Sequence, residues 1–546
     1  MRTPLRLLLI IITTGAMSVA ALTGCSPSAS SRSLVNVAIQ SDNMTRSFNP
    51  FLTTSALGQT SSSSGSGGFI YEPLVQINDV EIGHDLPWLA SSWAWSNQNK
   101  TLTLQLHKNV RWSDGKPFTS KDVAFTFGLL KKYPALNTQG VSFSTVSAPS
   151  TSTVVLDFPA PSAQYFTQIV STPIVSEHEW ASVGNPATFA DAHPVGTGPF
   201  VLSTFSPQSI TVTRNAHYWG GRPKIDGLRF IAYKDSQSET NAFVQGDVDW
   251  GGTYIADAQK SFVSKSPDNH YWAPVAGQDG LIPNLTVWPL SDLAVRKAIS
   301  LGVERAQIAA ASQDKPALNT SGLPVPAFSS DIASDLVDAN FTQDKAGAIA
   351  ILQKAGYTRG SDGYFQKNGK RLEFSITFPS AYTEIVARIQ VLVSQLKDLG
   401  IKLDLDATSV NSINQTTGSG HFQSTMGYPV SPAPTAFAMY DAMMNPNHYV
   451  PVGQDDSTFE DLERFQDPAA GALFTAYPAA TPAKQKQILD QIEHIWADQL
   501  PMISLIYWAN YSEWSTRHFT GFATAKDSYF APYPSEVVAL HLTPKR

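Results

Sequence analysis

Residues that could do catalytic chemistry are few in this sequence and lie far apart. Asp455 and Asp456 form a carboxylate pair of the kind that can serve a glycosidase as acid and base, but they lie in a polar stretch typical of a loop. The run Glu177-His178-Glu179 lacks the second histidine that the zinc-binding helix of a metallopeptidase needs. The patterns G-x-S-x-G, H-E-x-x-H and G-x-G-x-x-G do not occur. We therefore predict no catalytic residue, and a secreted hydrolase is the disfavoured interpretation.

The single cysteine, Cys25, is the residue whose position predicts a covalent modification. It follows a basic start formed by Arg2 and Arg6 and an apolar run from residue 7 to residue 22. This order is typical of a secretory signal peptide. The four residues Leu22-Thr23-Gly24-Cys25 resemble a lipobox, which implies transfer of a diacylglyceryl group to the Cys25 thiol and cleavage of the chain before it.

The predicted processing fixes the start and the location of the mature chain. We expect a lipoprotein signal peptide over residues 1–24 and a Ser-rich flexible tether over residues 25–33. Loss of Arg2 and Arg6 would change the formal net charge from −7 to −7 − 2 = −9. The expected location is extracytoplasmic, with the lipid on Cys25 holding the protein at the membrane, on the cell surface or in a periplasm. An ordinary signal peptide, or an anchor helix with a chance cysteine, is the alternative.

The composition is that of a large globular protein. With 546 residues, 42% hydrophobic and 15% charged, the chain is long enough for more than one domain and a sizeable core. The net charge of −7 and the absence of a basic block argue against nucleic acid as a partner. No C-x-x-C occurs and the eleven histidines are scattered, so we predict no metal site and no cofactor.

The stretch Thr101–Leu130 shows how the chain alternates between strand and helix. Leu102, Leu104 and Leu106 alternate with polar residues, which predicts a half-buried strand. Asp114-Gly115 is a turn signal, and Thr119 is a candidate N-cap for the helix that follows. Strand, turn and helix in this order are typical of an α/β domain.

The same periodicity recurs along the rest of the chain. Strands are expected at Leu34–Gln40, Ser152–Phe158, Ile401–Leu405 and Met502–Trp508, helices at Leu293–Ala311, Phe341–Tyr357, Glu384–Leu399 and Thr481–Leu500, and a terminal strand or strap at Val537–Leu542. Asp292 and Thr342 are the expected N-caps of the first two helices, and Gly400 should end the third.

Several segments resemble the family 5 extracellular solute-binding proteins, the receptors of peptide, dipeptide and nickel ABC importers. The resemblance lies in LQLHKNVRWSDGKPFTSKDVAFTF at 104–127, PVGTGPF at 194–200, NAHYWGGRPKID at 215–226 and FTQDKAGAIAILQKAGY at 341–357. At least eight segments match in the family's order, from about Val35 to Trp508. The match therefore spans most of the mature chain.

The resemblance implies a fold and a function. The fold is the α/β periplasmic-binding-protein type II architecture, with two lobes and an additional small domain, which makes three domains around a clamshell cleft. The function is to capture a solute outside the membrane by lobe closure and to deliver it to ABC transporter permease subunits. An oligopeptide is the expected solute and a monomer the expected state. An oligosaccharide or another neutral solute is the alternative, and a sensory domain is a third interpretation.

The resemblance also implies where the chain moves between domains. The expected boundaries are 34–70 for the first part of domain I, 71–192 for the small domain II, 193–277 for the second part of domain I, 278–504 for domain III, and 505–546 for the return to domain I with a C-terminal strap.

One departure from the family pattern bears on the ligand. Peptide-binding members carry an aspartate in the third domain that takes the α-ammonium of the peptide, and Ser431 stands at the matching place here, after the aromatic Tyr428. A neutral hydroxyl cannot replace that charge. The residues expected to contact the ligand are Phe48, Trp250, Tyr254, Trp288, Tyr428, Ser431 and Trp508. For each aromatic residue singly, a place in the core is the alternative.

Overall fold

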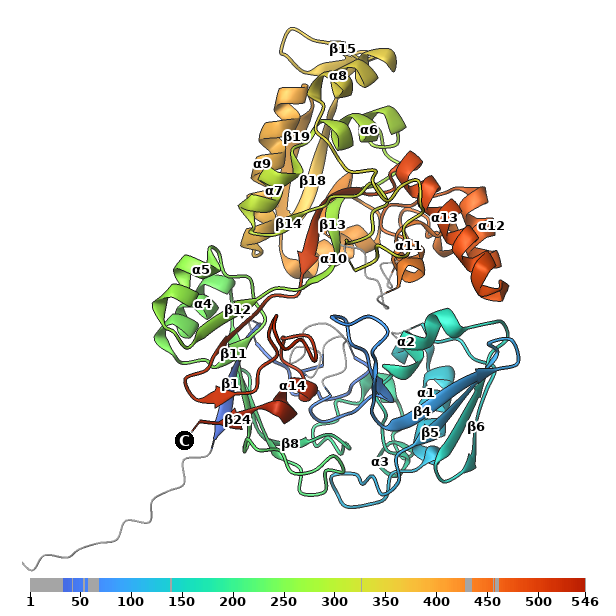
Figure 1. Ribbon diagram of the computed structural model, residues 1–546, viewed down its shortest axis with the longest axis vertical. Helices are drawn as coiled ribbons and strands as arrows, with labels where there is room; N and C mark the ends of the chain where they lie inside the picture. Colours follow the sequence, from blue (N-terminus) through green and yellow to red (C-terminus); the bar gives the residue numbers. More distant parts are fainter. Residues whose placement is uncertain are drawn as a thin grey trace, which may run out of the picture.

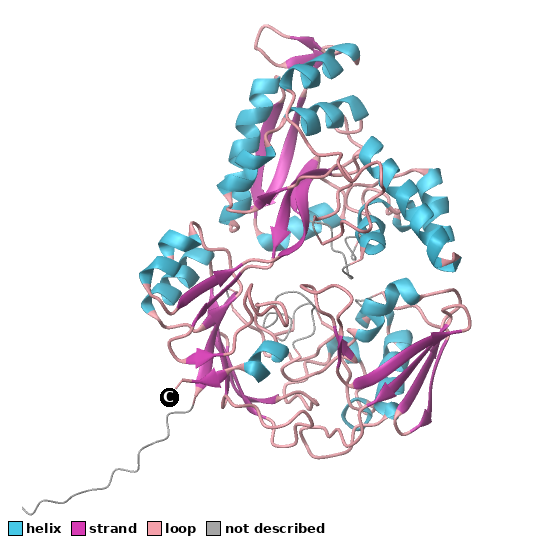
Figure 2. Ribbon diagram, viewed as in Figure 1, coloured by secondary structure: helices cyan, strands magenta, loops and turns pink. Residues whose placement is uncertain are grey.

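The computed structural model describes residues 33–41, 43–52, 55–56, 68–137, 140–325, 327–427, 435–454, 456 and 461–545. The predictions for the signal peptide, Cys25, Tyr428 and Ser431 concern residues outside these ranges. Figure 1 and Figure 2 show two bodies of mixed helices and strands, one above the other. We call the lower body, built from residues before 273 and after 511, the first lobe. The upper body, built from residues 275–509, is the second lobe.

The first lobe is built around a seven-stranded sheet. Its strands in order are β12 (Asn269–Trp272), β22 (Ser512–Ser515), β11 (Trp250–Gly251), β1 (Leu34–Gln40), β10 (Gly227–Tyr233), β9 (Ser209–Arg214) and β8 (Phe200–Ser206). The central strand β1 runs parallel to both β10 and β11. Val35 and Val37 of β1 are fully buried, as the predicted alternation requires. Helices α4 (Ser236–Gln245) and α5 (Ala258–Ser261) lie beside this sheet (Figure 1).

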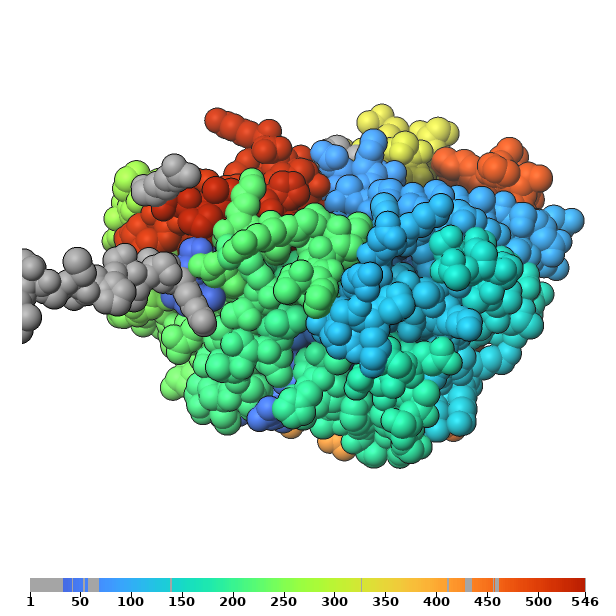
Figure 3. Space-filling model, turned by 90° about the horizontal axis from the view of Figure 1, so that it is seen from below, coloured from blue at the N-terminus to red at the C-terminus, as the bar shows by residue number. Residues whose placement is uncertain are grey.

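A four-stranded antiparallel sheet forms the other part of the first lobe. It consists of β4 (Ala90–Ser96), β5 (Thr101–Leu106), β7 (Thr153–Asp157) and β6 (Thr145–Ser150), packed against α1 (Ser120–Lys132). The N-cap prediction at Thr119 is confirmed, because its hydroxyl accepts from the Lys121 amide while Asp122 accepts from the Thr119 amide. Seen from below in Figure 3, the segments from this sheet and from the seven-stranded sheet form one continuous surface.

The second lobe is built around a six-stranded sheet. Its order is β14 (Lys315–Pro316), β21 (Ile503–Ala509), β13 (Val275–Pro283), β20 (Ser424–Gly427), β18 (Glu373–Pro379) and β19 (Lys402–Thr408). The strand β18 runs parallel to β19 and β20. One core lies between this sheet and α6 (Leu293–Gly302), α7 (Arg305–Ala311), α8 (Lys345–Lys354) and α9 (Thr383–Leu399). A second core joins α11 (Ala436–Met444), α12 (Pro468–Ala476) and α13 (Pro482–Gln499).

The chain passes between the lobes twice, from β12 to β13 and from β21 to β22. The two passages lie side by side, since the Asn510 amide donates to the Pro274 carbonyl at 2.9 Å. A further bond links the lobes where the Ala258 amide donates to Gln313 Oε1 at 3.1 Å. Two adjacent passages of a few residues each can act as a hinge between lobes.

Three predicted elements differ in the structure. The single helix expected at Leu293–Ala311 is divided into α6 and α7, because Val303 is extended and Glu304 caps the second helix. The N-cap of α8 is Asp344 and not Thr342, since the Asp344 carboxylate accepts from the Gly347 amide at 2.8 Å. The segment expected as a strand or strap at Val537–Leu542 forms the helix α14 (Glu536–His541). Val537 and Val538, which are adjacent in this helix, are both buried. In a strand with one face on the core, only one of two adjacent side chains would be buried.

Candidate functional site

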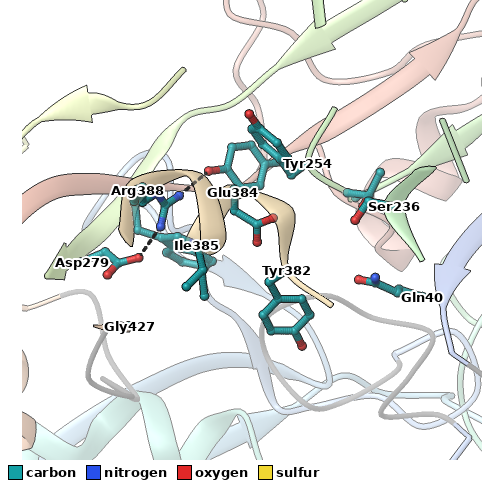
Figure 4. Close-up of a pocket in the computed structure, with 13 residues that line it drawn as sticks. Gln40, Ser236, Tyr254, Asp279, Tyr382, Glu384, Ile385, Arg388 and Gly427 are labelled. Carbon is teal, nitrogen blue, oxygen red and sulfur yellow. Dashed lines mark hydrogen bonds and ion pairs between the residues drawn. The ribbon is translucent and has the colours of Figure 1, made fainter. Parts of the chain in front are cut away.

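A pocket with a cavity volume of about 210 Å³ lies where the two lobes face each other (Figure 4). From the first lobe and its connection it is lined by Gln40, Ser236, Gly252, Thr253, Tyr254 and Tyr511, and from the second lobe by Asp279, Tyr382, Glu384, Ile385, Arg388, Gly427 and Trp508. The lining residues come from both lobes. A ligand enclosed between two lobes would contact both of them in this way.

The pocket lies at the carboxyl ends of parallel strands from both sheets. In the first lobe, Gln40 ends β1, and Gly252 to Tyr254 follow directly after β11. In the second lobe, Gly427 ends β20, and Tyr382 and Glu384 follow the end of β18 at the start of α9. Loops at the carboxyl ends of parallel strands are the usual place for ligands in open α/β sheets.

A buried ion cluster forms the wall of the pocket on the second lobe. Arg388 of α9 donates from Nη1 to Asp279 Oδ2 at 2.7 Å and from Nη2 to Asp314 Oδ2 at 2.6 Å. Its Nε donates to Ser312 Oγ at 2.7 Å. The side chains of Arg388, Asp279 and Asp314 are at most 3% exposed. This cluster fixes α9 to the middle of β13 and to the loop before β14.

Tyr511 connects this cluster to the first lobe. Its hydroxyl donates to Asp314 Oδ1 at 2.6 Å and accepts from Arg388 Nη2 at 3.2 Å. Its ring meets Tyr254 edge to face with centroids 5.5 Å apart and stacks on Tyr271 at 6.5 Å. Because Tyr511 lies in the passage between β21 and β22, its contacts place the hinge in direct contact with the pocket.

The acidic groups of the pocket carry perturbed pKa values. Burial raises the pKa of the Asp279 carboxyl to about 6, with the Asp314 charge adding to the effect and the Arg388 charge opposing it. Burial also raises the pKa of Glu384 above its ordinary value, and Arg388 again opposes this while Asp314 and Asp279 add to it. Burial lowers the pKa of Arg388, but Asp279 and Asp314 outweigh it and raise that pKa. The guanidinium therefore stays charged, whereas burial makes the Asp279 and Glu384 carboxyls easier to protonate than exposed acids.

The comparison with protein families identifies the family of the chain. The family described as "Bacterial extracellular solute-binding proteins, family 5 Middle" matches residues 86–449, which make up more than half of the chain. The chain belongs to this family. Membership indicates a solute-binding role and an extracytoplasmic location. In the part of the chain that the structure describes, no helix combines the length and the apolar character needed to cross a membrane.

The named relatives of the chain have low sequence identity to it. The nickel-binding periplasmic protein of Escherichia coli K12 is 26% identical over 398 residues, which cover 69% of this chain and 73% of that protein. The oligopeptide-binding protein OppA of Bacillus subtilis is 22% identical over 485 residues, or 82% of this chain and 84% of that protein. A crystal structure of a periplasmic oligopeptide-binding protein of Thermotoga maritima, with mannohexaose bound, has a TM-score of 0.83 at 22% identity. It covers 94% of this chain and 99% of its own, which confirms the two-lobe type II fold.

The structure brings two of the expected ligand-contacting residues of this family 5 protein to the pocket, Tyr254 and Trp508. It does not bring three others there. Phe48 is fully buried edge to face against Phe205, and Trp250 is fully buried with its Nε1 donating to the Pro532 carbonyl at 2.9 Å. Trp288 packs on the core of the second lobe. Phe48 and Trp250 occupy core positions, the alternative for each aromatic residue, whereas Trp288 is partly buried at the edge of a core.

The charged residues of the pocket are absent from the sequence-based set of ligand contacts. Asp279 and Arg388 are 109 residues apart, so no local pattern joins them. Glu384 had a usable signal, because it opens the helix expected at Glu384–Leu399, and in an α/β domain the start of a helix lies near the carboxyl end of a strand. Asp279 had a weaker signal, as an acid inside the mostly apolar run of β13.

Two acidic clusters elsewhere have structural explanations. Asp114, His178 and Glu179 place three possible metal-ligand atoms within 4.8 Å of one another, but all three residues are exposed. Glu179 belongs to the short helix α3 (Glu177–Trp180). Asp456 is buried, with Arg464 Nη1 at 3.6 Å from its Oδ2, and its sequence neighbour Asp455 lies outside the described residues.

Proposed function

We propose that this chain is the substrate-binding lipoprotein of an ABC importer and that it captures an oligopeptide between its lobes. The observation that carries the proposal is the acidic, aromatic pocket at the carboxyl ends of strands from both lobes. Family membership supports the binding role, and the name of the Bacillus subtilis relative supports the oligopeptide. Closure of the lobes would bury the solute and present the closed form to the permease subunits.

We propose that the protein is a monomer of three domains held at the membrane by a lipid on Cys25. The seven-stranded, four-stranded and six-stranded sheets would be the centres of domains I, II and III, with boundaries near residues 70, 192, 277 and 504. Cys25 precedes the first described residue, Ser33, by eight positions, so a tether of that length would separate the lipid from β1. No catalytic step is part of this function.

The binding of an oligosaccharide is the second candidate function. The Thermotoga maritima structure that supports it is named as an oligopeptide-binding protein yet contains mannohexaose. Tyr254, Tyr382 and Trp508 could stack on sugar rings in the same pocket. The neutral Ser431 in place of the family's aspartate favours the same alternative.

Intrinsic tryptophan fluorescence of the purified full-length chain tests the proposal, because Trp508 lines the pocket. The protein is titrated with a pool of tri- to hexapeptides and separately with mannohexaose. A saturable change with the peptide pool and none with mannohexaose supports the oligopeptide receptor. A change with mannohexaose alone replaces the oligopeptide by a sugar, and no change with either contradicts both candidate ligands.

A further inference from the structure

Glu384 is a partly buried acid of the pocket, and its carboxylate forms no ion pair with another residue that the structure describes. Its Oε2 is buried and has no hydrogen-bond partner among the described residues. Figure 4 shows the carboxylate directed into the space between Tyr254, Tyr382 and Gln40. An acid in the first turn of a helix is normally hydrated and stabilised by the helix dipole. A buried acidic oxygen without a donor is costly, so a partner from outside the described chain would relieve it.

Arg388, the cation nearest to Glu384 on the same helix, is already bonded to other carboxylates. Arg388 stands one turn later on α9, at the spacing where glutamate and arginine usually pair on a helix surface. Its two terminal nitrogens are instead bonded to Asp279 and Asp314. Three carboxylates therefore face one guanidinium, and the cluster has a formal charge of −2 when all four groups are ionised.

Asp279 adds a second unpartnered acidic oxygen to the same pocket, while its other oxygen is bonded to Arg388. Its side chain is 3% exposed, it lines the same pocket, and its Oδ1 has no hydrogen-bond partner among the residues that the structure places. Asp279 comes from β13 and Glu384 from α9, so two separate elements present unpartnered acidic oxygens to one cavity.

We infer that the pocket is a cation-anchoring subsite, in which Glu384, with Asp279 beside it, holds an ammonium group of the ligand. Under the function proposed above, on which this inference rests, that group is the α-ammonium of an oligopeptide. An ammonium has three donors for the acidic oxygens, and the faces of Tyr254, Tyr382 and Trp508 add attraction for a cation. A neutral sugar leaves the negative charge uncompensated. Glu384 thus supplies the anchor that the neutral Ser431 cannot, from a different element of the fold.

The test is a cycle that combines one substitution with one change of the ligand. The purified full-length chain and its Glu384→Gln variant are each titrated with a pool of tetrapeptides that have free amino termini and with the same pool after N-acetylation. We expect acetylation to weaken binding to the unmodified protein by about 30-fold or more, the loss typical of removing one partner of a buried charge pair. In Glu384→Gln the free pool should bind as weakly, and acetylation should change the affinity by less than about threefold.

Two further variants separate the anchor from general effects. Glu384→Asp keeps the charge and should keep most of the preference for the free pool. Glu373→Gln neutralises a partly exposed acid on β18 of the same lobe, outside the pocket, and this variant should bind both pools as the unmodified protein does. Unchanged circular dichroism of Glu384→Gln shows that the variant is folded.

Each other outcome overturns a distinct statement. If both pools bind equally to the unmodified protein, or if acetylation weakens Glu384→Gln as much as the unmodified protein, the anchor is wrong while the oligopeptide receptor stands. If neither pool binds, the oligopeptide assignment fails and the anchor fails with it. Binding of mannohexaose in that case identifies the sugar receptor.

Discussion

Replacing Arg388 by Met should destabilise the second lobe more than any exposed arginine change, because two buried carboxylates depend on it. Asp279 would keep no donor to its Oδ2, whereas Asp314 would keep the hydroxyls of Tyr511 and Ser312. Removing one partner of a buried ion pair costs about 3–5 kcal/mol, since the remaining charge stays desolvated. With an m-value of about 3 kcal/mol per M of urea, the unfolding midpoint should fall by about 1 M.

The assay is urea unfolding followed by circular dichroism and tryptophan fluorescence, with Arg371→Met as the matched control. Arg371 also contacts two carboxylates, Asp362 at 2.6 Å and Glu373 at 3.4 Å, but its side chain is 44% exposed. Water screens that pair of contacts, so its urea midpoint should not change measurably. The comparison tests burial, because the residue type, the number of carboxylate partners and the lobe are the same.

A second substitution tests the cause of the loss. Adding Asp279→Asn to Arg388→Met removes the stranded charge and should recover at least half of the lost stability. Equal midpoints for the Arg388 and Arg371 variants would refute the reasoning from burial. A double variant no more stable than Arg388→Met alone would refute the assignment of the loss to Asp279.

Three further outcomes follow from the structure and the sequence. Burial raises the pKa of Asp279 to about 6, and only the ionised carboxylate attracts a cation. The affinity for free-amine peptides should therefore fall about tenfold from pH 7 to pH 5 in calorimetric titrations. An unchanged affinity would argue against an acidic anchor. Asp344→Ala should destabilise the protein by about 1 kcal/mol through loss of the α8 cap, whereas Thr342→Ala should have no effect in the same urea assay. Cys25→Ser should abolish labelling of the protein by a lipid precursor and leave the unprocessed chain; normal labelling would contradict the lipobox interpretation.

Elements whose signals are local could be predicted from the sequence. The strand at Leu34–Gln40 is observed with its predicted bounds, and α9 ends at Gly400, which adopts a φ of 80°. Alternation, caps and left-handed glycines act over a few residues, so they can be read without tertiary context. The errors arose where two caps competed over a short distance, as at Thr342 and Asp344, or where neighbouring apolar residues fitted both a strand and a helix, as at Val537 and Val538.

The candidate site could be predicted only in part, because its chemistry depends on burial. Tyr254 and Trp508 belong to the ligand contacts expected from the sequence, but the same set includes Trp250, whose indole is buried in the core. Nothing in the sequence distinguishes the indole of Trp250 from that of Trp508. The charge of the pocket depends on Asp279 and Arg388, which only the folded sheet and helix bring together.

The ion cluster and the unpaired acid are parts of one arrangement. Glu384 and Arg388 stand one turn apart on α9 and would neutralise each other if the guanidinium were free. Asp279 and Asp314 hold the guanidinium on the far side, and Tyr511 fixes that geometry from the passage between the lobes. The charge of Glu384 therefore remains unpaired, because Asp279 and Asp314 bind the Arg388 guanidinium that would otherwise pair with it. A binding protein needs such a charge to remain uncompensated until the ligand arrives, since the affinity for the cation comes from the difference between the empty and the occupied site.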